Sequence, residues 1–373
     1  SIETMDIKQI RNDTPGVQYV KHFNNAGAAL QPKPVIEKIR QYQEDEYLYG
    51  GYETAAKYKS EIDDTYSSVA NLIGARPGEL ALVENATTAW DMAFHSLKFK
   101  EGDRILTSVA DYASNFIGFL QARKRFGVHI EVIPNDSDGQ IDLEILEAKA
   151  SDGAKLIAIN HMPTNSGLVN PVVEIGQIAR LKNITYLVDA CQSIGQVPIK
   201  VADIQCDFLS ATGRKYLRGP RGTGFLYVSE PMLKDIEPIF LDLHSAHWIS
   251  EDSYRVRADA RRFENWECNY SLRLGLKMAA EYALQREKEG SWARVQELGA
   301  SLRTKLSEVP RVHVYDQGKV LGGIVTFSLD GLSDKDLSQE LHRRGINVAV
   351  GPGNAALLDM QAKHLKSLIR ASV

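Results

Sequence analysis

Residues 185–192 read TYLVDACQ, a short apolar run that ends in the carboxylate of Asp189 before a polar turn. An apolar run of this length predicts a strand that is buried on both faces of a sheet. Burying a carboxylate at the end of such a strand is costly unless the carboxylate has a partner. The residues alone leave two interpretations of Asp189 open. It is either an N-cap of the next helix or the partner of a cationic group, such as a protonated pyridine nitrogen.

Similar apolar runs recur on both sides of this stretch, and helical patterns alternate with them. The two clearest helical patterns span Lys33–Tyr47 and Ala56–Gly74. This alternation is typical of a mainly parallel sheet with helices on both faces, so we predict an α/β fold. The other predicted strands are Leu80–Val83, Arg104–Thr107, His129–Ile133, Lys155–Ile159 and Gly224–Val228.

The pattern changes beyond residue 270, where longer helices precede short strands. We predict an N-terminal arm (1–20), a large domain (21–265) and a small C-terminal α+β domain (266–373). The N-terminal arm is a candidate to pack with the small domain. The elements predicted in the small domain are helices at Ser271–Arg286, Ser291–Val309 and Lys335–Arg344 and strands at 312–315, 323–327 and 346–350.

Composition and charge exclude several classes of function. The chain has 373 residues, 43% of them hydrophobic and 25% charged, with a net charge of −4, so a nucleic-acid partner is not expected. No apolar run approaches the roughly 20 residues needed to cross a membrane. The N-terminal residues show no export signal, and the three cysteines follow no metal-binding spacing. We therefore expect a cytoplasmic enzyme with reduced thiols, no bound metal and no membrane contact.

A loop rich in glycine and hydroxyl groups surrounds Lys215, where residues 210–225 read SATGRKYLRGPRGTGF. A lysine that is desolvated among other cations loses its proton more easily, and its neutral amine can attack an aldehyde. The alternative is a basic surface turn that binds nucleic acid. Neither a repeated interleaving of aromatic residues nor a wider basic field supports binding of single-stranded nucleic acid here, so we favour the reactive lysine.

A second candidate site follows the predicted strand Leu80–Val83, where Ala86, Thr87 and Thr88 open a helix. Backbone N–H groups and small hydroxyl side chains at a helix N-terminus can hold a phosphate group. On these residues alone, an ordinary helix cap is the favoured interpretation. No glycine-rich nucleotide motif follows this strand, which excludes a nicotinamide or nucleotide enzyme.

These motifs together identify a family resemblance. Asp189 and Gln192, followed by the run from Thr212 to Lys215, resemble fold-type I pyridoxal-phosphate (PLP) enzymes of aminotransferase class V. This group contains cysteine desulfurases, isopenicillin N epimerase-like proteins and hercynylcysteine sulfoxide lyases. The resemblance runs from Phe23 to Ser372, and it implies a homodimer with shared active sites.

The resemblance also implies a role for individual residues. Lys215 would form a Schiff base with PLP and then move protons at the substrate α-carbon. Asp189 would pair with the pyridine nitrogen, and Gln192 would reach the phenolic oxygen. The remaining implied contacts are Ala86, Thr87, Thr88, Thr212 and Arg214 around the phosphate, Tyr112 stacked on the ring, Thr164 near the ring oxygen, Arg370 on the substrate carboxylate, and Ala28 and His244 at the substrate.

One departure separates the chain from the desulfurases it resembles. Desulfurases carry a nucleophilic cysteine on a loop before the carboxylate-binding arginine, whereas residues 350–358 here contain none. Without a thiolate on that loop, we expect no persulfide-forming desulfurase. The segment 50–53 resembles the lyase and epimerase branch instead, so we expect β-elimination from a cysteine conjugate or sulfoxide. The alternatives are an aminotransferase, an amino-acid epimerase and a PLP-binding regulator without turnover.

Overall fold

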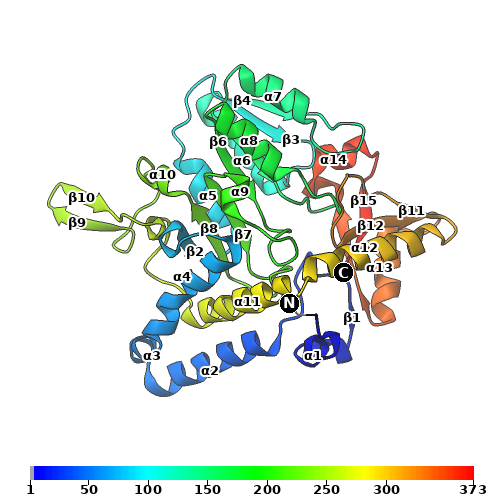
Figure 1. Cartoon of the computed structure of the whole chain (residues 1–373), viewed down its shortest axis with the longest axis horizontal. Coiled ribbons are helices and arrows are strands. Elements are labelled where there is room, and N and C mark those ends of the chain that lie inside the picture. The colour runs from blue at the N-terminus through cyan, green and yellow to red at the C-terminus, as the bar shows by residue number, and fades with distance from the viewer. Residues whose placement is uncertain (1–3) are drawn as a thin grey trace.

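The structure, a computed structural model, describes residues 4–373 (Figure 1). Its centre is a seven-stranded sheet in the order β2-β8-β7-β6-β5-β3-β4, in which β8 alone runs antiparallel to both of its neighbours. This mainly parallel sheet between helices confirms the predicted α/β fold. The strands are β2 (Leu80–Val83), β3 (Arg104–Ser108), β4 (His129–Ile133), β5 (Leu156–Asn160), β6 (Thr185–Asp189), β7 (Phe208–Thr212) and β8 (Gly224–Val228).

The two faces of the sheet are covered by different sets of helices because successive strand residues point to opposite sides. In β2, Leu80 and Leu82 belong to one buried cluster, and Ala81 and Val83 belong to the other. The first cluster includes side chains of α4 (Lys59–Ile73), α7 (Leu143–Ser151), α8 (Val172–Leu181) and α11 (Tyr270–Lys288). The second includes side chains of α5 (Ala86–Ser96) and α6 (Ala113–Phe126).

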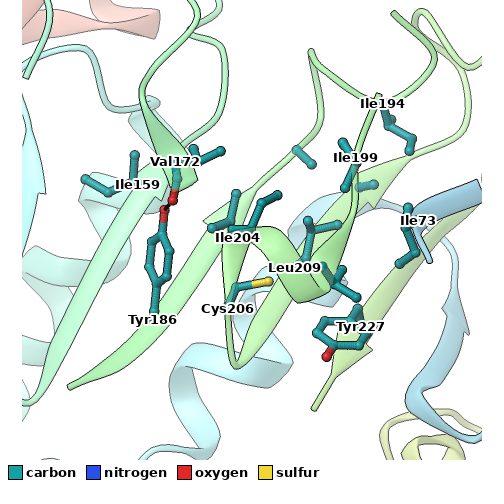
Figure 2. Close-up of a cluster of buried hydrophobic side chains, with 14 of the residues drawn as sticks. Ile73, Ile159, Val172, Tyr186, Ile194, Ile199, Ile204, Cys206, Leu209 and Tyr227 are labelled. Atoms are coloured by element: carbon teal, nitrogen blue, oxygen red, sulfur yellow. Dashed lines mark hydrogen bonds between the residues drawn. The ribbon is translucent and has the colours of Figure 1, made fainter. Parts of the chain in front are cut away.

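The first of these clusters is dense with branched aliphatic side chains (Figure 2). Tyr186 is part of this cluster. Its hydroxyl donates a hydrogen bond to the Val172 carbonyl at 2.9 Å, so the buried hydroxyl has a partner. Cys206 is buried in the same cluster, where burial raises the pKa of its thiol. This cysteine is therefore part of the hydrophobic core.

The N-terminal helices differ from the sequence prediction at one point. The predicted helix Ala56–Gly74 is divided into α3 (Gly51–Lys57) and α4, with non-helical Tyr58 between them. The Tyr58 hydroxyl donates to Asp45 at 2.7 Å, and Asp45 lies on α2 (Lys33–Tyr49). Helical periodicity alone carries no signal for this break.

The C-terminal residues form a second sheet in the order β11-β12-β15-β14 (Figure 1). Strand β15 (Ser367–Ser372) was not predicted, and it lies between β12 and β14. The elements of this part are α12 (Ser291–Ser307), β11 (Val312–Val314), β12 (Ile324–Leu329), α13 (Asp334–Arg343), β13 (Ile346–Asn347), β14 (Ala349–Pro352) and α14 (Leu357–Ala362).

The N-terminal segment reaches this second sheet. Strand β1 (Lys21–His22) pairs in parallel with β13, and Asn24 forms a bridge with Ser372. Helix α11, by contrast, packs on α2 and α4 of the large domain. The domain boundaries at 20 and 265 stay a prediction, and residues 1–3 of the proposed arm lie outside the described residues.

A two-stranded hairpin, β9 (Ala246–Ser250) and β10 (Ser253–Val256), projects from the body (Figure 1). It was not predicted, and most of its side chains are exposed. The remaining short helices of the described chain are α1 (Ile7–Asn12), α9 (Val201–Ile204), α10 (Glu230–Leu233) and the single turns Pro15–Gln18, Pro77–Glu79, Ala260–Phe263 and Gly353–Ala355. Among residues 4–373, no helix has the length and apolar character that crossing a bilayer requires.

Candidate active site

The candidate site lies at the carboxyl edge of the large sheet. Tyr112, Thr164, Asp189 and Lys215 each follow the carboxyl end of one strand, in the order β3, β5, β6 and β7. These strands are parallel, so their carboxyl ends meet at one edge, which is where open α/β sheets build their ligand sites. Residues from four separate parts of the sequence are therefore brought together.

Lys215 is the group on which the charges of the site converge. Burial, together with the charges of Arg214 and Arg370, lowers the pKa of its amine to about 8, although Cys191 and Asp189 act in the opposite direction. Its side chain nevertheless stays partly accessible to solvent. Such an amine is neutral in a substantial fraction of molecules near pH 8, as the predicted attack on an aldehyde requires.

A tight turn holds the lysine loop in place. Gly213 N–H donates to the Thr223 carbonyl at 2.9 Å, and Gly219 N–H donates to the Gly213 carbonyl at 2.7 Å. A Cβ atom at Gly213 would lie 2.1 Å from the Thr223 hydroxyl oxygen, so only glycine fits without rearrangement. The turn therefore fixes the direction in which Lys215 leaves the sheet.

Asp189 is almost fully buried at the end of β6. One carboxylate oxygen accepts a hydrogen bond from Cys191 N–H at 2.9 Å, and the other accepts one from Asn115 Nδ2 at 2.9 Å. Within residues 4–373, the structure records no salt bridge to this carboxylate. A carboxylate has about four acceptor positions, so Asp189 keeps capacity for a further donor such as a pyridine N–H.

Two further buried groups have unused hydrogen-bonding capacity. The Gln192 Nε2 atom donates to the Ala26 carbonyl at 3.1 Å, but its Oε1 atom has no partner among the described residues. The Arg370 guanidinium donates from Nη1 to Thr164 Oγ1 at 3.0 Å and to the Thr164 carbonyl at 3.2 Å, and its buried Nε is unpartnered. Buried polar atoms without partners are rare, so both favour a polar ligand at this place.

The residues predicted to hold a phosphate lie around the start of β8. Gly224 pairs with Val83 on one side and with Thr212 on the other, so the start of α5 and the end of β7 flank it. Arg214 Nη1 donates to Thr212 Oγ1 at 3.2 Å. Asn85 caps the Thr88 N–H at 2.8 Å, which supports the helix-cap interpretation as well as the anion-binding one.

The remaining predicted contacts lie beside this centre. Burial lowers the pKa of Arg370, and Tyr112 and Arg214 each lie close enough to shift this pKa as well, upward and downward respectively. Ala28 lines a cavity of about 360 Å³ together with Arg214. Within residues 4–373, no group of three or more His, Cys, Asp or Glu side chains is arranged to hold a metal ion.

His244 is engaged in a different network. Its Nε2 lies 2.9 Å from Oε1 of Glu264, a buried carboxylate that also accepts hydrogen bonds from Tyr66 and from Leu82 N–H. Burial alone would raise the pKa of Glu264, but the hydrogen bond from His244 and the charge of Arg273 lower it. The substrate-binding role of His244 stays a prediction.

We expect Glu264→Ala to cost about 3–5 kcal/mol of unfolding free energy, because it leaves buried donors and the Arg273 charge without their acceptor. Urea denaturation measures this cost. Glu267→Ala is the matched control, since Glu267 is exposed three residues away and should change stability by less than about 0.5 kcal/mol. In the wild type, the lowered pKa means that this stabilisation is complete above the usual pKa of glutamate and is lost as pH falls below it. Equal stability of the two variants would contradict the structural role of Glu264.

Sequence reasoning missed two polar residues of the site, Asp111 and Asn115, which contact each other and connect to Asp189. A signal was present in the sequence. Asn115 follows Tyr112 by three residues, within the first turn of α6, and so faces the same edge of the sheet. Its partner Asp189 is 74 residues away in sequence, and only the fold reveals that contact.

The family described as Aminotransferase class-V matches residues 21–373. The chain belongs to this family. A protein named "Probable cysteine desulfurase" from Methanothermobacter thermautotrophicus is 27% identical over 379 residues, covering 99% of this chain and 94% of that protein. Another of the same name, from Pyrococcus abyssi, is 28% identical and covers 98% and 92%.

Solved structures agree with this assignment. The apo structure of a cysteine desulfurase from Thermococcus onnurineus NA1 has a TM-score of 0.90 and 27% identity, covering 100% of this chain and 94% of that one. A C-DES variant with glycine covalently linked to its PLP cofactor shares the fold at a TM-score of 0.86 and 23% identity, covering 99% and 94%. The predictions of a class V enzyme and of PLP as its cofactor are therefore confirmed at the level of the family.

The expected reaction, by contrast, is wrong. We expected β-elimination from a cysteine conjugate or sulfoxide and excluded a persulfide-forming desulfurase, yet the relatives named cysteine desulfurase match nearly the whole chain. The missing cysteine at residues 350–358 concerns only the group that accepts sulfur. The residues predicted to bind PLP and the amino acid are spread over the rest of the chain. One loop was therefore insufficient evidence for a different reaction, and the alternatives to the lyase are not pursued.

Proposed function

We propose that this chain is a PLP-dependent enzyme that removes sulfur from L-cysteine. The observation that carries the proposal is the convergence of Lys215, Asp189 and Arg370 at one edge of the sheet. These groups are suited to an aldehyde, a pyridine nitrogen and a substrate carboxylate, respectively. The relatives named cysteine desulfurase support cysteine as the amino acid.

The chain's own residues fit the cofactor. Lys215 would bind its aldehyde and Asp189 its ring nitrogen, while Gln192 has an unpartnered oxygen in the same buried region. The N-terminus of α5, together with Thr212 and Arg214, would hold the phosphate. Bound PLP supplies an electron sink that stabilises negative charge at the substrate α-carbon. The stacking of Tyr112 and the contact of Thr164 with the ring oxygen stay predictions.

Lys215 would also move protons. With its pKa lowered to about 8, the freed amine can take a proton from the α-carbon and return one to the product. Arg370 would hold the carboxylate of the amino acid, because its planar guanidinium can donate two parallel hydrogen bonds. Its contacts with Thr164 fix the guanidinium from one side and leave Nε unpartnered among the described residues.

The sulfur acceptor in this proposal is a thiol from outside the chain. Burial is the largest effect on each of the three thiols, and it raises the pKa of Cys191, Cys206 and Cys268. None is therefore a ready thiolate nucleophile near neutral pH. The balanced reaction is L-cysteine plus a thiol giving L-alanine plus a persulfide. The C–S bond of cysteine breaks, an S–S bond forms, and a proton is delivered to the β-carbon.

The reaction is tested with the PLP-loaded protein, L-cysteine and dithiothreitol. We expect alanine and sulfide in equal amounts, since excess dithiothreitol reduces its own persulfide, and we expect a rate that rises with thiol concentration. Cys268→Ser should keep this activity, because Cys268 is outside the proposed site. Release of pyruvate and ammonia in place of alanine would show that sulfur is not transferred to a thiol.

We also propose a homodimer and a cytoplasmic location. The projecting β9–β10 hairpin exposes Trp248, Ile249 and Tyr254, and large apolar side chains gathered on one projection are typical of an interface. A second copy of the chain is the partner that the family resemblance implies, and light scattering of the purified protein measures it. The three unpaired cysteines support a reducing compartment.

A further inference from the structure

A buried chain of hydrogen bonds connects Asp189 to a second carboxyl group. Asn115 Nδ2 donates to Asp189 Oδ2 at 2.9 Å and to Asp111 Oδ1 at 3.3 Å, so one amide group bridges the two carboxyl groups. Asp111 is itself held by the Thr107 hydroxyl and by Tyr112 N–H, the latter at 2.7 Å. Each of these buried side chains is less than a tenth exposed.

The bridge spans two strands that are not neighbours. Asp111 follows β3 and Asp189 ends β6, and β5 lies between these strands in the sheet. The end of β5 is bound separately, because Asn160 Nδ2 donates to the Ala110 carbonyl at 2.7 Å. Asp111 lies in the turn after β3, and Asn115 lies in the first turn of α6. Among the described residues, Asn115 is thus the side chain that connects Asp111 to the Asp189 carboxylate.

Two buried carboxyl groups that share one amide are costly to maintain. Burial is the largest cause of a pKa of Asp111 raised to about 7; the nearby charge of Asp189 also raises it, and the hydrogen-bond donors lower it. A packed apolar pair at this place would avoid the desolvation cost. Stability therefore does not account for the polar bridge. Its geometry does account for a role in fixing the orientation of the Asp189 carboxylate.

We propose that Asn115 is a positioning residue that holds the Asp189 carboxylate in line with the pyridine nitrogen of PLP, with Asp111 as its anchor. The inference rests on the proposed function, in which Asp189 pairs with that nitrogen. Asn115 fixes one carboxylate oxygen and Cys191 N–H fixes the other. Without the amide, the carboxylate can turn away, and a hydrogen bond to the ring nitrogen loses its alignment.

The test compares the binding of PLP with that of 1-deaza-PLP, in which a C–H group replaces the ring nitrogen. We expect Asn115→Leu to raise the dissociation constant for PLP about 10- to 100-fold, the usual size of effects from groups behind a ligand. The dissociation constant for the deaza analogue should stay within about 2-fold of the wild-type value, because Asp189 has no ring N–H to bind. Titration of the apoprotein measures both constants without any assay of turnover.

Asn160→Leu is the matched control, because it removes an equally buried amide next to Asp189 across the strands, and the recorded hydrogen bonds of this amide go to Ala110 and Asn170 and not to the Asp189 carboxylate. It should keep the wild-type ratio of the two constants. If Asn115→Leu does not fold, Asn115→Ser replaces it, since a serine hydroxyl is too short to bridge both carboxyl groups. A wild-type ratio in a folded Asn115 variant would overturn the inference. A wild-type protein that binds both ligands equally would overturn the pairing of Asp189 with the nitrogen, and the positioning role with it.

Discussion

Lys215→Ala should lose the yellow absorption band that PLP gives on covalent capture by a lysine, and sulfur release should fall by at least about 10⁴-fold. The reason is that one side chain would serve both as the attachment point and as the proton carrier, and loss of an acid–base group alone costs up to about 10⁴-fold. Visible absorption of the PLP-loaded protein and alanine formation from L-cysteine measure the two losses.

Two variants make this result specific. Lys215→Arg keeps the positive charge but cannot supply a neutral amine, so it should be as inactive as Lys215→Ala. Lys234→Ala removes an exposed lysine and should change neither measurement. In the wild type, covalent capture of added PLP should speed up as pH rises through about 8, because the neutral fraction of Lys215 grows there. An unchanged band in Lys215→Ala would assign the cofactor to another lysine.

Arg370→Ala should raise the KM for L-cysteine about 10²- to 10³-fold and change kcat much less. In the proposed function the guanidinium of Arg370 binds the substrate carboxylate, and two charge-assisted hydrogen bonds are worth about 3–5 kcal/mol together. Arg370→Lys should recover only part of the loss, since an ammonium group cannot pair with both carboxylate oxygens in one plane.

Cysteamine distinguishes carboxylate binding from a general disturbance of the site. It has the amine and thiol of cysteine but no carboxylate, so wild type and Arg370→Ala should process it at similarly low rates. A variant that loses activity on cysteamine to the same degree as on cysteine would show that Arg370 supports the fold of the site. An unchanged KM for cysteine would contradict the assignment outright.

The strands of the large domain illustrate what local sequence carries. Strands β2, β4 and β8 have the predicted bounds; β2 and β8 are short apolar runs between polar turns, and β4 alternates apolar residues with His129 and Glu131. Strand β15 contains Arg370 and two serines, so its polar residues conceal a strand that tertiary pairing creates. The hairpin β9–β10 escaped prediction for a related reason, because most of its side chains are exposed and it has no buried alternation to detect.

In the candidate site, too, some residues can be recognised from the sequence and others only from the fold. Lys215 and Asp189 stand out in sequence because a charged residue beside a buried strand needs a reason, and glycines around the lysine mark a tight turn. Glu264 gave no comparable signal, yet it is fully buried beside Tyr66 and His244. Its partners come from separate parts of the chain, and a contact of this kind depends on the packing of whole elements.

The sequence by itself determined the class of the fold, and it predicted Lys215 as the reactive lysine and Asp189 as the carboxylate for the ring nitrogen, because apolar periodicity and isolated charges act over a few residues. It did not determine the reaction, since the loop without a cysteine concerns the acceptor alone. Only the tertiary structure placed Arg370 beside Lys215 and linked Asp189 through Asn115 to Asp111. Those contacts join residues far apart in sequence. Parallel strands bring Asp111 and Asp189 to one edge of the large sheet, whereas Arg370 reaches Lys215 from β15 of the second sheet.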